Sequence, residues 1–305
     1  MTGRTTAETP FDELETEARD PSAADLDLQS TAQLVALMNE ADAGVPTAVA
    51  RAADTIAAAI DAVVERLAAG GRLVYVGAGT SGRLAVVDAA ECESTFAVPP
   101  GRVVALIAGG AAATATAQEE AEDDREAGTK AIHALGVDSA DAVVGLSASG
   151  RTPYVVAALD AARGAGATTV AIVSVEGSEL GAVAAHEIVV LVGPEVIAGS
   201  TRLKAGTAQK LVLNMISTIA MIRLGKTFGN LMVDVVATND KLRARVRRIV
   251  AAASGASPDR VEAALDEADG DAKVAIVALA RGVDAVTARG RLEETAGDVR
   301  KALAP

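Results

Sequence analysis

The fold of this chain is decided by residues 72–83, which read RLVYVGAGTSGR. A short apolar run gives way to glycines and hydroxyl residues, and helix-forming residues follow. This order is typical of a buried parallel strand that ends in a tight turn at the start of a helix. Residues 142–153, AVVGLSASGRTP, repeat the arrangement. Both stretches therefore predict a strand followed by a helix.

Working outward, five short apolar runs are separated by segments of helix length. The runs cover residues 72–76, 103–107, 142–146, 169–173 and 188–192. Strands that alternate with helices indicate βαβ units and a parallel sheet covered on both faces. The sequence thus predicts the α/β class, with a doubly wound parallel five-stranded sheet. A long helix over residues 201–224 follows the last run.

The segments on either side of the sheet read as helical. Before it, Ser30 and Gln33 form a capping box that opens a helix, and a second helix is expected over residues 45–69. After residue 234 we expect short helices, one with a basic face at residues 241–248. We predict an N-terminal helical segment (1–64), a central α/β domain (65–228) and a small C-terminal helical module (229–305). The N-terminal segment shows no obvious chemistry.

Composition excludes several classes of function. The chain has 28 Lys and Arg against 41 Asp and Glu, a net charge of −13, which repels nucleic acid and anionic membranes. With one Cys and two His it can form neither an intrachain disulfide nor a Cys/His zinc site. No apolar leader or run of about 18 apolar residues occurs. We expect a cytoplasmic protein with no nucleic-acid or membrane partner.

Two loops, residues 77–83 and 147–153, are the candidates for ligand binding. In open α/β sheets, ligands bind beyond the carboxyl ends of the strands, beside the point where the strand order reverses. Glycines allow close backbone approach, and amide groups at a helix N-terminus together with Ser and Thr hydroxyls bind anions. One such loop can equally be an ordinary helix cap. Two at comparable positions favour phosphate binding.

The first loop also satisfies the pattern G-x-G-x-x-G of dinucleotide-binding proteins. That fingerprint requires an acidic residue at the end of the second strand, to bind the ribose. Residues 106–110 read LIAGG and provide none. A nicotinamide cofactor is therefore disfavoured.

Three carboxylates lie near the predicted loops: Glu91 after the first loop, Glu122 in the helix expected after the second strand, and Glu195 after the fifth strand. Composition alone favours a solvated helix face for the acidic stretch that contains Glu122, and a surface or helix-end charge is the alternative interpretation of Glu91. Spacing alone does not decide between these interpretations.

The longer motifs resemble a known family. The two loops resemble the phosphate loops of the sugar isomerase (SIS) domain. Other stretches resemble the family of N-acetylmuramic acid 6-phosphate etherases: residues 16–19, 106–110, 121–123, 199–210 and 228–234. The resemblance covers residues 16–300. Asp20 departs from it, because the family usually has Asn there.

The resemblance implies a reaction and a set of residues. Such enzymes cleave the lactyl ether of a phosphosugar by eliminating D-lactate and then adding water to give N-acetylglucosamine 6-phosphate, with no metal and no cofactor. Glu91 would be the acid toward the leaving oxygen, and Glu122 the acid/base at carbon 2. The implied substrate-binding and phosphate-binding residues are Thr80, Ser81, Ser147, Ser149, Gly150, Thr152, Glu195 and Lys204.

Three further expectations complete the interpretation. We infer that Lys204 and Arg202 could neutralise the lactyl carboxylate, although a helix-end surface charge fits them equally well. SIS domains commonly share residues between protomers, so we expect a homodimer with composite active sites. The alternatives are an aldose–ketose isomerase of a hexose 6-phosphate, which would release no lactate, and a non-catalytic sensor of sugar phosphates.

Overall fold

The structure is a computed structural model and describes residues 15–235, 237 and 239–304. The chain forms two compact units. The first contains the residues up to Asp88 together with Val104–Ile216, and the second contains Ala89–Val103 together with the residues from Ser217 onward. The sequence-based division at residues 64 and 228 differs from these boundaries and stays a prediction.

The first unit is built on a five-stranded sheet with the order β2-β1-β3-β4-β5. The pairs β1–β3, β3–β4 and β4–β5 are parallel, with Leu73 opposite Ala142 and Ala142 opposite Thr168. The strands are β1 (Leu73–Gly77), β2 (Val103–Ile107), β3 (Ala142–Leu146), β4 (Thr168–Val173) and β5 (His186–Val189). The predicted doubly wound sheet is confirmed, with small shifts at β1, β4 and β5.

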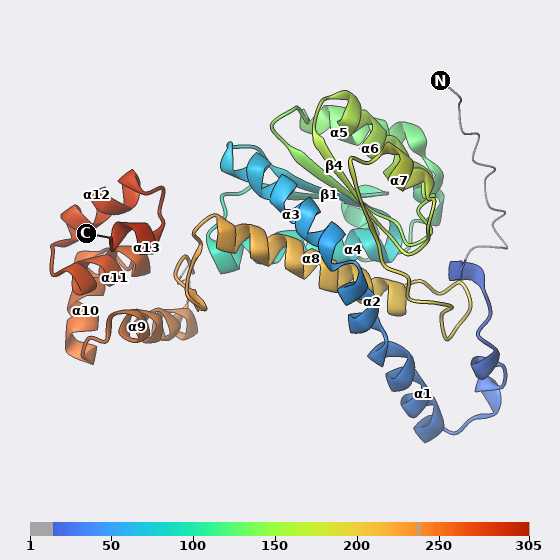
Figure 1. The fold of residues 1–305 in the computed structure, drawn as a ribbon, viewed down its shortest axis with the longest axis horizontal. Coiled ribbons are helices and arrows are strands. Elements are labelled where there is room, and N and C mark those ends of the chain that lie inside the picture. The colour runs from blue at the N-terminus through green and yellow to red at the C-terminus, as the bar shows by residue number, and fades with distance from the viewer. Residues whose placement is uncertain (1–14, 236, 238, 305) are drawn as a thin grey trace. The chain divides into compact units, whose positions relative to one another are not determined.

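Helices cover both faces of the sheet (Figure 1). On one face α5 (Arg125–Leu135), α6 (Pro153–Gly164) and the short α7 (Glu179–Val183) pack over β1, β3 and β4 around buried residues such as Val143 and Leu159. On the other face α3 (Ala53–Ala68) crosses β1, β3, β4 and β5. Because both faces are covered, the strands are apolar along their whole length, as the sequence predicts for a parallel sheet.

The strand order reverses at β1, since β2 lies on one side of it and β3 on the other. The carboxyl ends of β1 and β3 are therefore neighbours, and so are the loops that follow them. Helix α4 (Gly79–Phe96) begins directly after β1, and six residues separate the end of β3 from the start of α6. The first turn is tight: a Cβ atom on Gly77 would lie 2.6 Å from the Gly82 nitrogen.

The N-terminal segment is helical but more broken than predicted. The capping box is confirmed at the start of α1 (Thr31–Ala43), where Ser30 and Gln33 each bond the other's backbone amide. The single helix expected over residues 45–69 is two helices, α2 (Val45–Arg51) and α3, separated at Ala52. No glycine or proline marks this break. The described residues before α1 form 3₁₀ turns: η2 (Glu15–Glu17), η3 (Pro21–Ala23) and η4 (Leu26–Leu28).

Helix α8 (Lys204–Arg223) begins three residues later than predicted and leads into a small hairpin, β6 (Thr227–Phe228) and β7 (Leu231–Met232). Helices then complete the chain: α9 (Asp240–Ser254), α10 (Pro258–Glu267), α11 (Ala272–Arg281), α12 (Ala285–Glu294) and α13 (Val299–Ala302). The hairpin and α13 were not predicted.

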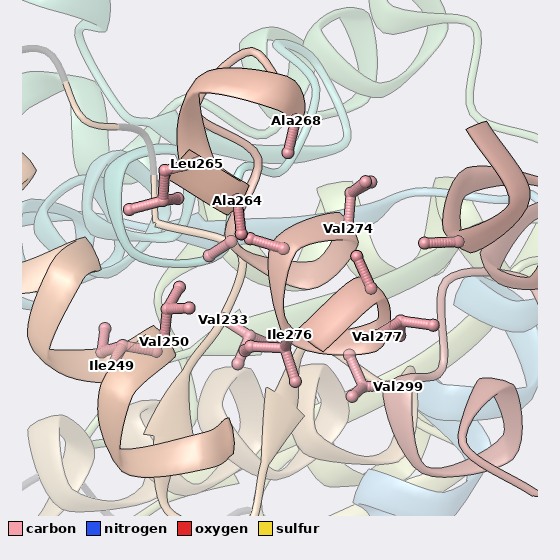
Figure 2. Close-up of a cluster of buried hydrophobic side chains, with 14 of the residues drawn as sticks. Val233, Ile249, Val250, Ala264, Leu265, Ala268, Val274, Ile276, Val277 and Val299 are labelled. Atoms are coloured by element: carbon pink, nitrogen blue, oxygen red, sulfur yellow. The ribbon is translucent and has the colours of Figure 1, made fainter. Parts of the chain in front are cut away.

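The C-terminal helices pack around a core of their own (Figure 2). Val250, Ile276 and Val277 are fully buried in it, and Val233 joins it from the end of the hairpin. A buried ion pair lies at its edge, where the Lys273 ammonium is 2.5 Å from the Asp234 carboxylate. This core supports the interpretation of the C-terminal region as a helical module. In the described part of the chain, no helix combines the length and apolar character that crossing a membrane requires.

Candidate active site

A cavity of about 660 Å³ opens in the first unit where β1 and β3 end. The loops after these two strands line it, together with residues 117–119, Glu122 and Asp123, which follow β2, and residues 199–202, which precede α8. Glu17 reaches it from the N-terminal turn η2. The cavity thus lies at the switch point of the strand order, where ligands bind in sheets of this type.

The loop after β3 presents a cluster of hydroxyl groups to the cavity. The Ser147 Oγ atom lies 2.8 Å from Thr152 Oγ1 and 3.4 Å from Ser149 Oγ, and all three residues line the cavity. Thr152 is the N-cap of α6, yet its side chain makes no capping hydrogen bond, and Pro153 follows it. The amides of Val155 and Val156 in the first turn of α6 both donate to the Thr152 carbonyl. The turn therefore contributes to an anion site mainly through the positive end of the helix dipole.

Gly150 shapes this loop without lining the cavity. Its φ angle is +66°, and a Cβ atom there would lie 2.3 Å from the Ser178 Cβ atom. The Gly150 carbonyl also accepts a hydrogen bond from the Leu180 amide at 2.9 Å. Only glycine fits this conformation and this space, so Gly150 fixes the position of the hydroxyl residues on either side of it.

The loop after β1 contributes Thr80 and Ser81, both of which line the cavity from the first turn of α4. The Ser81 hydroxyl donates a hydrogen bond to Gln209 Oε1 at 2.8 Å. Gln209 lies on α8 and is 2% exposed. No local pattern in the sequence marks Gln209, because its partner Ser81 lies 128 residues away in the chain.

Glu122 lies in the cavity, but not in the α-helix that we predicted after β2. It belongs to a 3₁₀ turn, η6 (Glu119–Asp123), and α5 starts after it. Burial raises the pKa of this carboxyl group, with smaller upward contributions from Asp123 and Glu119, while Arg83 acts in the opposite direction. A Cβ atom on Gly79, whose φ is +50°, would lie 2.7 Å from Glu122 Oε1. The carboxyl group thus rests against the backbone of the first loop.

Glu91 is placed differently from the other predicted catalytic residue. It is exposed on α4, twelve residues beyond Gly79, which is about 18 Å of helix rise. Among the residues that the structure describes, the lining of the cavity does not include it. Its catalytic role stays a prediction.

Glu195 and Lys204 lie at the buried start of α8. The two Glu195 carboxylate oxygens accept hydrogen bonds from the amides of Lys204 and Ala205 at 3.0 and 2.9 Å. The Lys204 ammonium donates to the carbonyl of Val192 at 2.8 Å. Within the described chain neither residue belongs to the lining of the cavity, and their substrate-binding roles stay predictions.

The cavity also holds charged side chains to which we assigned no role from the sequence. Arg83 and Arg151 line it beside the predicted Arg202, and Arg83 donates a hydrogen bond to the carbonyl of Thr116 at 3.1 Å. Glu17 adds a carboxylate from a segment to which we assigned no chemistry. The resemblance at residues 16–19 was the one available signal for it. In the described part of the chain, no group of His, Cys, Asp and Glu side chains is arranged to hold a metal ion.

Comparisons with known proteins identify the domain. Residues 120–219 match the model of the SIS domain, and residues 55–163 match that of the glucokinase regulatory protein N-terminal SIS domain. Among solved structures, a phosphoheptose isomerase from Francisella tularensis is 20% identical, with a TM-score of 0.49, over 64% of this chain and 100% of that one.

Relatives that match over nearly their full length identify the family. A protein from Rubrobacter xylanophilus is 61% identical over 95% of this chain and 96% of its own length. One from Streptomyces avermitilis is 56% identical over 95% and 94%, and one from Escherichia coli (strain HS) is 48% identical over 96% and 98%. All three are named N-acetylmuramic acid 6-phosphate etherase. This chain belongs to the family of N-acetylmuramic acid 6-phosphate etherases.

Proposed function

We propose that this protein cleaves the lactyl ether of N-acetylmuramic acid 6-phosphate in the cavity at the ends of β1 and β3. The observation that carries the proposal is the identity of 48–61% to etherases over nearly the whole chain. The cavity supports it, because one volume combines an anion-binding loop with a carboxyl group whose pKa burial raises.

The 6-phosphate binds at the loop after β3. The hydroxyl groups of Ser147, Ser149 and Thr152 act as hydrogen-bond donors, and Gly150 holds the loop in place. The positive end of the α6 dipole adds a favourable potential for the phosphate. Thr80 and Ser81 approach from the first turn of α4. Two helix N-termini therefore stabilise a dianion inside a protein whose net charge is −13.

The chemistry is an elimination followed by a hydration. Glu122 removes the proton from carbon 2, which is acidic because the open-chain sugar carries an aldehyde at carbon 1. The bond between carbon 3 and the ether oxygen breaks, and Glu91 donates a proton to the departing D-lactate. Water then adds to carbon 3 of the unsaturated aldehyde, and carbon 2 regains a proton. A buried carboxyl group with a raised pKa is the stronger base once ionised, which suits Glu122 to its step.

The lactyl carboxylate needs a cation of its own. Arg202 lines the cavity within residues 199–202, whereas the Lys204 ammonium is bonded to the Val192 carbonyl. We therefore assign the lactyl carboxylate to Arg202 in preference to Lys204. A guanidinium group binds a carboxylate through two parallel hydrogen bonds, which also fixes its orientation.

The protein works as a homodimer in which each site combines residues of two protomers. Glu91 is exposed, and the cavity of its own chain is lined without it. Apolar side chains are also exposed in the first unit: Val87 on α4 is 60% exposed and Met215 on α8 is 37% exposed. A symmetric partner that covers such a surface would bring Glu91 to the cavity of the other protomer.

Incubation with N-acetylmuramic acid 6-phosphate in oxygen-18 water, followed by mass spectrometry, tests the reaction. We expect unlabelled lactate, together with N-acetylglucosamine 6-phosphate that carries the label at carbon 3. Oxygen at carbon 1 exchanges through the aldehyde hydrate, so the product is first returned to ordinary water to remove label from that position.

Two outcomes would contradict the proposal. Label in the lactate hydroxyl group would mean that the bond on the lactate side breaks, which excludes elimination. Absence of lactate would contradict the etherase activity itself and favour the isomerase alternative.

A variant of the phosphate loop, Ser149→Ala, tests phosphate binding. It should raise KM with little change in kcat, since it removes a contact that substrate and transition state share.

A further inference from the structure

The cavity contains a carboxylate that the two-glutamate mechanism leaves without a role. Glu17 belongs to the 3₁₀ turn η2, 105 residues before Glu122, yet both side chains line the same cavity. The turn is held in place by its neighbour Thr16, which is 4% exposed. A described, anchored segment therefore places this carboxylate in the cavity that we propose for the sugar.

The segment before α8 is shaped to accept this side chain. Gly199 has a φ of +76°, and a Cβ atom there would lie 2.9 Å from Glu17 Oε2. Any larger residue at Gly199 would meet the carboxylate. The close approach of Glu17 to this segment thus depends on a glycine whose backbone conformation other residues rarely adopt.

The chemistry of the substrate narrows what Glu17 can contact. An ionised carboxylate only accepts hydrogen bonds, and it is repelled by the phosphate and by the lactyl carboxylate. The sugar offers three donors, because oxygen 3 is etherified and oxygen 6 is phosphorylated. They are the hydroxyl groups on carbons 1 and 4 and the amide N–H on carbon 2.

The proposed reaction has a step for which no group has yet been named. Carbon 2 becomes acidic only when carbon 1 is an aldehyde, so the pyranose ring must open first. Glu122 and Glu91 are already assigned to carbon 2 and to the leaving oxygen. We infer that Glu17 is a third catalytic residue, the base that opens the sugar ring by removing the proton of the carbon 1 hydroxyl. This inference rests on the proposed function.

The step balances without any further reagent except water. Glu17 takes the proton from the hydroxyl group on carbon 1, and the electrons of that O–H bond form the carbonyl. The bond between carbon 1 and the ring oxygen breaks, and the ring oxygen takes a proton from a water molecule. The proton on Glu17 then returns to solvent.

The product, N-acetylglucosamine 6-phosphate, allows ring opening to be measured apart from ether cleavage. Its α and β anomers interconvert through the open chain, and exchange NMR measures that rate. We expect the wild-type protein to accelerate the exchange above the buffer rate. Glu17→Gln should lose at least about 10²-fold of that acceleration, the lower end of the range for removal of a general base. Glu15→Gln is the matched control, since Glu15 lies in the same turn and is exposed.

Binding is measured in parallel by calorimetric titration with N-acetylglucosamine 6-phosphate. Glu17→Gln should bind it within a few-fold of wild type, because the amide still accepts a hydrogen bond. Acceleration by Glu17→Gln equal to wild type would overturn the inference, and so would absence of acceleration by the wild-type protein. A loss explained wholly by weakened binding would also overturn it. Lactate release by the wild type is scored separately, so failure of the etherase proposal is distinguished from failure of this one.

Discussion

The hydroxyl group of Ser81, in the first turn of α4, donates a hydrogen bond to the side-chain carbonyl of Gln209 on α8 at 2.8 Å. Ser81 lines the cavity, whereas Gln209 is buried behind it. The Gln209 amide nitrogen is buried and makes no hydrogen bond within the described residues. A buried amide that bonds only one cavity hydroxyl is suited to orienting it. Gln209 is therefore a positioning residue for Ser81.

Replacement of Gln209 by Met, which has a similar volume, should free the Ser81 hydroxyl. We expect KM to rise about two- to tenfold, the equivalent of about 0.5–1.5 kcal/mol for one net hydrogen bond, with little change in kcat. Thermal stability should not fall, because the substitution also removes an unpaired buried amide nitrogen. The control is Lys210→Met on the exposed side of the same helix.

A second substitution separates positioning from packing. If Gln209 acts through Ser81, then Gln209→Met should add little to the KM of a Ser81→Ala variant. Additive effects of the two substitutions would contradict the positioning role.

Gly79→Ala should disable the site by displacing Glu122. The added Cβ atom would lie 2.7 Å from Glu122 Oε1, in a residue whose φ is +50°. Gly110→Ala is the control, because Gly110 has a φ of +65° and no neighbouring atom within 4 Å of the added Cβ. Both variants carry a similar backbone penalty of about 1–2 kcal/mol. We expect kcat to fall at least tenfold more in Gly79→Ala, and equal kcat values would contradict the contact.

The sequence revealed the elements whose pattern is local. The strands are short apolar runs separated by segments of helix length, so all five were found, and Gly79 and Gly150 marked both ligand loops. Position made Glu122 one of three candidate carboxylates, but only the resemblance assigned it a role, because its 3₁₀ turn has no periodicity that distinguishes it from a helical acidic face. Glu17 and Gln209 reach the cavity from distant parts of the chain. Their proximity depends on tertiary packing, which no local pattern encodes.

The raised pKa of Glu122 has a consequence for the pH dependence of activity. A base at carbon 2 must be ionised, and burial raises the pKa of the Glu122 carboxyl group from its ordinary value. We expect the acid limb of kcat to lie above the ordinary carboxyl pKa, and Glu122→Gln to lose about 10²–10⁴ of kcat. The measurement is a rate profile between about pH 4 and pH 8. An acid limb at the ordinary carboxyl pKa would contradict the effect of burial.

The same shift predicts how stability depends on pH. The folded carboxyl group holds its proton more tightly than the unfolded one, so the free energy of unfolding falls as pH rises between the two pKa values. At neutral pH that penalty is fully present, and Glu122→Gln removes it. The variant should therefore be at least as stable as wild type near neutrality, and its advantage should shrink toward acid pH. Denaturant unfolding at both ends of the range checks this, and a variant less stable at neutral pH would contradict it.

Mixing two inactive variants tests the composite site. If Glu91 and Glu122 of one site come from different protomers, a dimer of Glu91→Gln with Glu122→Gln has one intact site. Random exchange makes half of the dimers mixed, so about a quarter of the wild-type activity should return. The control mixes Glu91→Gln with the double variant, where no combination restores a site. If both glutamates of a site came from one protomer, neither mixture would regain activity.

The ion pair between Lys273 and Asp234 ties the end of the hairpin to α11 in the C-terminal module. The ammonium lies 2.5 Å from the carboxylate and also donates a hydrogen bond to the Gly225 carbonyl at 3.1 Å. A second lysine, Lys226, lies 3.5 Å from the same carboxylate, but its side chain is more exposed than that of Lys273.

Removal of the sole partner of a buried charge costs about 3–5 kcal/mol, and removal of Lys273 should cost less, because Asp234 keeps the more exposed Lys226. Lys273→Met should therefore lower the free energy of unfolding much more than Lys226→Met, as measured by denaturant titration. Adding Asp234→Leu to Lys273→Met should recover part of the loss, because it removes the stranded carboxylate. A double variant no more stable than Lys273→Met would contradict this role of the ion pair. The loss of stability in Lys273→Met would then come from packing and from the hydrogen bond to Gly225.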